Sequence, residues 1–164
     1  MDLESALTEL APNLLRFCTG LSGDPAEGEE VAQEALASLV RFWRRRGAPD
    51  SPKAFVYAVA RRQAFRARWR RRLFAPLEAA ERRSDPGAGP EESSGERDRV
   101  RAVLRALTDL PGRDRQALLI SALEEFSVEE AARVLGISAS AFKMRVHRAR
   151  ARLALKLGEA DDAG

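Results

Sequence analysis

The sequence predicts an all-α fold: two small helical domains joined by a flexible linker, the second containing a helix-turn-helix. Apolar residues recur at three- and four-residue spacings along most of the 164 residues, and no stretch shows the alternation typical of a strand. Between residues 75 and 97 the periodicity is lost, and Pro, Gly, Ser and Glu accumulate in a composition that cannot bury enough surface to order itself. We therefore expect domains at 1–74 and 98–158 and a linker at 75–97.

Three helices are expected in the first domain. Apolar residues from Leu3 to Leu21 share one helical face, and Pro12 is expected to kink or divide that helix. The stretch GDPAEGEE supplies an aspartate cap, a proline at the first helical position and a glutamate three residues after the cap, so a helix should run over 25–43. A third helix is expected over 52–72. The second of these helices should bury Val31, Ala35, Leu36, Leu39, Val40 and Trp43.

The second domain also begins with helices. Apolar residues between 100 and 107 indicate the first, and another follows Pro111. An S-x-x-E capping box at 127–130 opens a short helix over 128–135, and Ser138 caps the last helix.

A short helix, a tight turn through Gly136 and a longer basic helix match the helix-turn-helix, whose second helix enters the DNA major groove. Because successive residues turn by about 100°, one narrow arc should face inward: Phe142, Val146, Ala149 and Leu153. The remaining positions are then available to phosphates and base edges: Ser140, Lys143, Met144, Arg145, His147, Arg148 and Arg152. The alternative is a solvated basic helix that ends a bundle.

Charge is unevenly distributed, although the chain carries 28 Lys and Arg against 25 Asp and Glu. Residues 1–40 are mainly acidic, residues 41–72 are strongly basic, and no acid occurs over 138–156. Two basic zones behind an acidic one suggest a polyanion and a separate basic partner.

The first basic zone, FVYAVARRQAFRARWRRR, interleaves rings with guanidinium groups. Aromatic side chains stack on exposed bases at about 1 to 3 kcal/mol each while arginines hold phosphates, so such a surface suits a single strand. Its members are Tyr57, Arg61, Phe65 and Trp69 at four-residue steps, with Arg68 and Arg72 beside them. Two alternatives stay open: the rings are core and the arginines only solvated, or the stretch contacts a membrane surface.

The helix expected over 25–43 offers an acidic surface. Glu30, Gln33, Glu34 and Ala37 lie away from its apolar face and suit a basic protein partner. The alternative is that this face only keeps the protein in solution.

Several function classes are excluded by what the chain contains. A single cysteine, Cys18, and a single histidine, His147, allow neither an internal disulfide nor a conventional zinc set, and Cys18 is expected to be a buried hydrophobe. No nucleophile elbow, phosphate-binding loop or metal-ligand cluster is visible, so we expect no enzyme, metal or cofactor. The chain start lacks a secretory signal and no apolar run approaches a membrane span, which predicts a cytoplasmic protein.

Three blocks cover nearly the whole chain: PNLLRFCTGLSGDPAEGEEVAQEAL, KAFVYAVARRQAFRARWRRR and LPGRDRQALLISALEEFSVEEAARVLGISASAFKMRVHRARARL. In this order they resemble the opening helices with the D-x-V-Q-E polymerase-binding motif, the promoter-melting helix, and the C-terminal domain of the extracytoplasmic-function (ECF) sigma factors of bacterial RNA polymerase, in the sigma-70 superfamily.

The resemblance implies a subunit that directs core RNA polymerase to promoter DNA and initiates transcription. By resemblance, Glu30, Gln33 and Glu34 would bind the clamp helices of the polymerase large subunit. The loop 46–52 and the helix to Arg72 would open and hold the minus-10 element, and the last helix would read the duplex minus-35 element. An anti-sigma protein is a further expected partner.

Some positions depart from the family pattern. Phe55 stands where the family often has Trp, and Arg62 and Arg66 replace a frequent Asn and Asp. We hypothesise that these two arginines hold the melted strand through its phosphates. The segment 140–144 replaces a common G-T-V-K-S and loses two hydroxyls, which puts the promoter sequence in question.

Two other functions remain as alternatives. A free-standing helix-turn-helix regulator would bind an operator as a dimer without polymerase, and it would have no need of the acidic surface. An RNA-binding or membrane-surface adaptor would use residues 61–72 but would leave the C-terminal hairpin unexplained.

Overall fold

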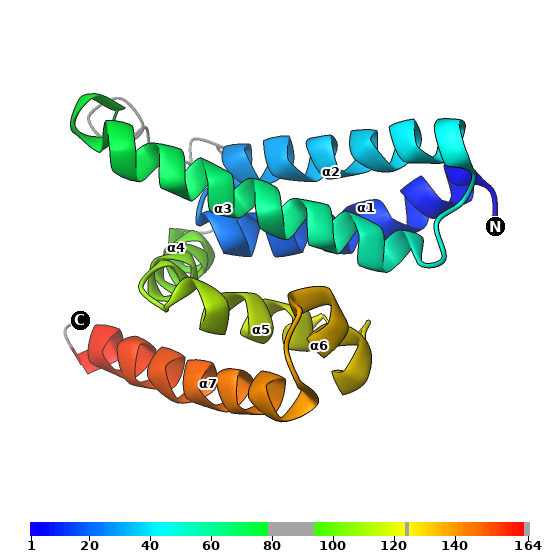
Figure 1. Ribbon diagram of the computed structural model, residues 1–164. Coiled ribbons are helices and arrows are strands. Elements are labelled where there is room, and N and C mark those ends of the chain that lie inside the picture. Colours follow the sequence, from blue (N-terminus) through cyan, green and yellow to red (C-terminus); the bar gives the residue numbers. More distant parts are fainter. Residues whose placement is uncertain (79–93, 124, 163–164) are drawn as a thin grey trace.

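The computed structural model describes residues 1–78, 94–123 and 125–162, which form seven helices and no strand (Figure 1). The first group comprises α1 (Leu3–Ser22), α2 (Pro25–Arg46) and α3 (Pro52–Glu78). The second comprises α4 (Ser94–Thr108), α5 (Gly112–Ala122), α6 (Val128–Leu135) and α7 (Ala139–Asp162). The predicted all-α fold class is confirmed.

The first two helices begin at aspartate caps. Asp2 Oδ1 accepts a hydrogen bond from the Ser5 N–H at 2.7 Å, and Asp24 Oδ2 accepts one from the Glu27 N–H at 3.4 Å. Each bond satisfies an N–H group that has no partner within its helix. The predicted start of the second helix is therefore confirmed, and Arg46 ends it three residues beyond the expected end.

Pro12 does not divide α1, so of the two predicted effects of this proline, a kink or a division, the division is wrong. The helix is continuous from Leu3 to Ser22, with Pro12 on its exposed side. A proline at this position removes one backbone hydrogen bond. Leu10 and Leu14 on either side of it are buried in the core and hold the helix against its neighbours.

Helices extend into both ends of the expected linker. α3 continues through residues 75–78 and α4 already begins at Ser94. The remainder of the expected linker, residues 79–93, lies outside the described residues. At the other end of the chain, α7 ends at Asp162, beyond residue 158, where the second domain was expected to end.

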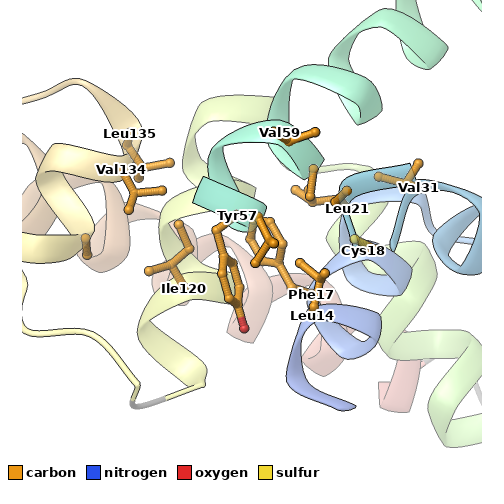
Figure 2. Close-up of a cluster of buried hydrophobic side chains, with 14 of the residues drawn as sticks. Leu14, Phe17, Cys18, Leu21, Val31, Tyr57, Val59, Ile120, Val134 and Leu135 are labelled. Carbon is orange, nitrogen blue, oxygen red and sulfur yellow. The ribbon is translucent and has the colours of Figure 1, made fainter. Parts of the chain in front are cut away.

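The two groups of helices share one hydrophobic core. α1 packs against α2 and α3 within the first group, and it also contacts α4 and α5, while α3 contacts α6. Figure 2 shows this junction, where Phe17 and Tyr57 of the first group lie beside Ile120 and Val134 of the second. The two predicted domains therefore also contact each other through buried side chains.

The predicted inward faces are largely correct. In α2, Val31, Ala35 and Leu39 are buried, while the other three expected residues are half-buried. In α7, Phe142, Val146 and Ala149 are buried and Leu153 is half-buried. Cys18 is buried as expected, and burial raises the pKa of its thiol to about 12.

Candidate nucleic-acid interface

The helix-turn-helix begins at a complete capping box. Ser127 Oγ accepts a hydrogen bond from the Glu130 N–H at 3.1 Å, and Glu130 Oε2 accepts one from the Ser127 N–H at 2.8 Å. The backbone hydrogen bond from Ser127 lowers the pKa of the Glu130 carboxyl. These reciprocal bonds fix the start of α6 at the predicted residue.

Gly136 makes the turn between α6 and α7. Its φ of 68° is left-handed, and the Ile137 N–H donates to the Ala132 carbonyl at 3.0 Å. This conformation favours glycine, because a Cβ would clash with the following carbonyl. Ser138 Oγ then accepts from the Ala141 N–H at 3.1 Å and caps α7. The glycine turn and the serine cap that the sequence predicted therefore set the direction in which α7 leaves the turn.

The first half of α7 presents most of the predicted base-reading residues to solvent. Ser140, Lys143, Met144 and His147 are exposed, and Arg145 is half-buried. Met144 is the most exposed apolar residue of the set, at 61%. A surface of this kind at the start of a recognition helix can contact base edges and phosphates.

Arg148 and Arg152 have a different environment, because both reach Asp114 at the start of α5. Their guanidinium nitrogens lie 3.3 Å and 3.7 Å from the two Asp114 carboxylate oxygens. Asp114 is buried, whereas the two arginine side chains are about half exposed. The role of Asp114 was not predicted from the sequence, although an acid at the start of a helix in a domain with a basic last helix is a signal that could have indicated it.

The α3 surface retains two of its three rings. Phe65 is 64% exposed and Trp69 56% exposed, with Arg62 and Arg66 exposed nearby. Arg61 is half-buried, and burial lowers its pKa. An open cleft of about 280 Å³ lies between α3 and the start of α5, lined by Phe65, Arg68, Trp69, Arg72, Pro111, Gly112, Arg113 and Gln116.

Tyr57 does not belong to this surface, and the sequence prediction is wrong on this point. It is fully buried, its ring packs against Phe17 and Phe126 with centroids 5.0 Å away in both cases, and its hydroxyl donates to Glu125 Oε2 at 3.0 Å. Burial raises the pKa of its phenol. Four-residue steps drift around a helix, and the twelve residues from Tyr57 to Trp69 leave the two rings about 120° apart.

The acidic surface on α2 is present as predicted. Glu30, Gln33 and Glu34 are exposed. Glu34 forms an ion pair with Arg41 at 2.6 Å, and hydrogen bonding from Arg41 lowers the pKa of the Glu34 carboxyl. Glu34 thus has a cationic partner, whereas Glu30 forms no ion pair with any residue that the structure describes.

The part of the chain that the structure describes holds no group of three or more residues able to bind a metal ion. Among the same residues, no helix has the length and apolar character needed to cross a membrane.

The protein therefore consists of two groups of helices, the second of which contains a helix-turn-helix. It carries three distinct surfaces: the basic residues of α7, the aromatic rings and arginines of α3, and the acidic residues of α2. Residues 7–73 match sigma-70 region 2, and residues 100–153 match sigma-70 region 4. The chain belongs to the ECF sigma factors of the sigma-70 family. It is thus a transcription initiation factor that directs RNA polymerase to promoters, and nothing supports the alternative of a free-standing regulator.

Individual relatives agree with this assignment. The chain is 31% identical to the ECF RNA polymerase sigma factor SigD of Mycobacterium tuberculosis over 98% of its own length and 79% of that protein. It is 30% identical to the RNA polymerase sigma-E factor of Streptomyces antibioticus, covering 98% of this chain and 87% of the relative. Its fold is similar to that of the sigma factor RpoE from Bartonella quintana, solved with the anti-sigma factor NepR, with a TM-score of 0.74, 22% identity and coverage of 94% and 96% of the two chains.

Proposed function

We propose that three surfaces divide the sigma role, with region 2 at 1–74 and region 4 at 98–158. The α7 surface reads duplex minus-35 DNA, the α3 surface holds melted minus-10 DNA, and the α2 surface binds the polymerase clamp. The helix-turn-helix is the observation that carries this proposal, because its capped turn leaves the first half of α7 exposed.

The minus-35 reading rests on Ser140, Lys143, Met144, Arg145 and His147. Arg148 belongs to the same set, but its ion pair with Asp114 favours a positioning or phosphate role over base reading. Met144 and the serine present few hydrogen-bonding groups, so base discrimination should come chiefly from Lys143 and Arg145.

A run-off transcription assay with bacterial core polymerase and fragmented DNA from the source organism tests the proposal. Discrete transcripts that require the protein are expected, and their start sites give the promoter. Lys143→Ala and Arg145→Ala should each lose about 1 to 3 kcal/mol of discrimination at one base position, whereas Arg99→Ala, which removes an exposed cation from α4, should leave the transcripts unchanged. A uniform loss on all DNA sequences would reassign the residue to phosphate binding.

The minus-10 role falls to rings and arginines of α3, of which Arg61 and Arg68 are half-buried and the others exposed: Arg61, Arg62, Phe65, Arg66, Arg68 and Trp69. Stacking on the rings and phosphate contacts by the arginines together grip an unpaired strand. If Arg62→Ala and Arg66→Ala open promoters at the normal rate, the phosphate-capture hypothesis for these two arginines fails. Tyr57 could join this set only after the two halves of the molecule separate, since its ring is buried between them.

Polymerase binding is assigned to Glu30, Gln33 and Glu34. Glu30→Lys reverses one charge without breaking an ion pair of the described residues, so it should weaken binding to core polymerase while leaving the melting temperature unchanged. Glu9→Lys makes the same charge change on exposed α1 and serves as the control. Equal binding by both variants would contradict the clamp assignment.

The remaining parts of the proposal concern chemistry and partners. We place the activity in the cytoplasm, where bacterial polymerase and chromosome meet, and we assign the chain no catalytic residue, metal or cofactor, because bond formation belongs to the polymerase. We also propose an anti-sigma partner, by analogy with the Bartonella quintana complex.

A further inference from the structure

The open cleft between α3 and the start of α5 is lined by residues from both helices. α3 contributes two exposed rings, Phe65 and Trp69, and two arginines, while the first residues of α5 contribute Gly112, Arg113 and Gln116. The proposed minus-10 contacts use only the α3 side of this cleft. Its α5 side adds polar groups that the proposed promoter contacts do not use.

The charged side chains that line the cleft are all positive. Arg68, Arg72 and Arg113 line it, and no aspartate or glutamate does. None of these three arginines forms an ion pair with a residue that the structure describes. Because cations that line a concave surface add their fields, the cleft attracts an anion.

A buried arginine strengthens this positive field. Arg68 reaches the start of α5, since a Cβ added at Gly112 would lie 3.3 Å from its Nη1 atom. Arg115 of α5 is 3% exposed and donates to three backbone carbonyls at 2.7 to 2.9 Å. Burial and, second, the charge of Arg68 lower the pKa of Arg115 to about 10, against a smaller opposite effect of Asp109. Arg115 is therefore charged at neutral pH, and an anion in the cleft would offset its repulsion with Arg68.

Two aromatic rings give the cleft a surface for a planar group. Phe65 is 64% exposed and Trp69 56% exposed. The two residues are four positions apart on α3, so they lie on the same side of the helix about one turn apart. Rings bind nucleic-acid bases by stacking, and arginines beside them hold phosphates. A lining of rings and arginines is therefore suited to a nucleotide.

Gln116 adds a hydrogen-bonding group to this lining. Its side chain is half-buried and forms no hydrogen bond with a residue that the structure describes. A side-chain amide offers both a donor and an acceptor, which match the edge of a base. The cleft volume of about 280 Å³ is close to the lower limit of ligand pockets, about 300 Å³, so the cleft has room for a single nucleotide and not for several stacked bases.

We propose that this cleft binds a free nucleotide that carries more than one phosphate. The base stacks on Phe65 and Trp69 and its edge bonds to Gln116. The phosphates bind to the three arginines of the lining. A phosphate without a base would leave the rings and the amide unused, and a nucleoside would leave the arginines without an anion. This site belongs to the free protein and does not depend on the proposed promoter contacts.

Isothermal titration calorimetry with the full chain tests the site, with ATP and GTP as probes. Saturable binding of one nucleotide per chain is expected. Adenosine and inorganic tripolyphosphate each carry one half of the ligand and should bind at least roughly tenfold more weakly than ATP. Tripolyphosphate binding as tight as that of ATP would make the cleft an anion site only and would overturn the proposal. The absence of saturable binding of either nucleotide up to about 1 mM would overturn it as well.

Substitutions in the lining locate the ligand. Arg72→Ala removes a phosphate partner and Trp69→Ala removes a ring, so each should weaken ATP binding roughly tenfold. Trp69→Phe keeps a ring and should retain most of the affinity. Arg105→Ala, at an exposed arginine of α4, and Phe74→Ala, at an exposed ring of α3 outside the cleft, are the controls and should bind ATP as the wild type does. Equal losses in lining and control variants would show non-specific attraction to a basic protein and would overturn the site.

The nucleotide in this cleft could come from solution or from the melted promoter strand, because Phe65 and Trp69 also belong to the proposed minus-10 set. Arg113 distinguishes the two sources, since it lies on α5, outside that set. Arg113→Ala should weaken ATP binding by the free protein roughly tenfold and leave binding of a single-stranded minus-10 oligonucleotide by holoenzyme unchanged. Loss of oligonucleotide binding in this variant would assign the α5 side to the strand and overturn a separate site. Failure of wild-type holoenzyme to bind the oligonucleotide would instead refute the proposed function, and ATP binding by the free protein would still decide the cleft.

Discussion

The two long basic helices, α3 and α7, carry similar sequence signals but acquire their buried faces in different ways. In α7 the inward residues Phe142, Val146 and Ala149 pack within the second group and beside the helices nearest in the chain. In α3 the decisive neighbour of Tyr57 is Glu125, 68 positions away. The spacing of apolar residues predicted the buried face of α7 correctly, but it did not predict that Tyr57 of α3 is buried.

This difference shows when the exposed residues of a basic helix can be predicted from the sequence alone. Where a helix packs against its own turn partners, a 100° projection gives both faces. Where a second domain covers part of the surface, the projection gives only the face that the first domain buries. Phe65 and Trp69 lie further along α3, beside the open cleft between this helix and the start of α5, and both rings remain more than half exposed.

The largest expected effect on the free energy of unfolding comes from removing a buried side chain from the inward face of α7. Phe142 is 5% exposed, so Phe142→Ala should lower the free energy of unfolding by about 3 to 5 kcal/mol through lost burial and a cavity. Urea unfolding followed by circular dichroism measures the change. Met144→Ala, at a site 61% exposed, is the control and should change it by less than about 0.5 kcal/mol. Similar losses at the two positions would mean that the assigned inward face is wrong.

The turn that directs α7 should show the next largest effect. Gly136→Ala should cost about 1 to 2 kcal/mol, because alanine must adopt the left-handed conformation. An added Cβ at Gly136 meets nothing within 4 Å, so strain in φ is the whole cause. Thermal unfolding provides the measurement. Gly158→Ala, at an exposed helical glycine with equally open space, is the opposite control and should stabilise the protein or leave it unchanged.

Much of the fold and part of the candidate site followed from local chemistry. The caps at Asp24 and Ser127 and the turn at Gly136 are short-range features, so the element starts could be read from the sequence. The roles of Asp114 and Glu125 could not be read in the same way, since their partners are 34 to 112 positions distant. Pro12 failed as a helix breaker because burial on both sides of it outweighed one lost hydrogen bond.

The buried ring of α3, Tyr57, should make the free energy of unfolding depend on pH. The raised pKa of Tyr57 in the folded state means that its contribution to stability is fully present below pH 10, the ordinary pKa, and is lost as the pH rises above that value. Between pH 9 and 11 the wild type should therefore lose about 1.4 kcal/mol more stability than Tyr57→Phe. Denaturant unfolding at the two pH values measures this difference. Parallel pH profiles would place the phenol in solvent and would remove the contrast between the two helices.

The exposed ring of α3 should show the smallest effect on stability together with a clear effect on DNA. Trp69 is 56% exposed, so Trp69→Ala should change the free energy of unfolding by less than about 0.5 kcal/mol. If Trp69 stacks on an unpaired base, the same variant should lose about 1 to 3 kcal/mol in binding a single-stranded minus-10 oligonucleotide, measured by fluorescence anisotropy with holoenzyme. Phe74→Ala removes a ring that is 59% exposed further along α3 and outside the proposed strand-binding set, and it should leave this affinity unchanged. Equal losses from both variants would mean that any exposed ring of α3 contributes to binding, whereas a loss confined to Trp69 would place the strand beside the cleft between α3 and α5.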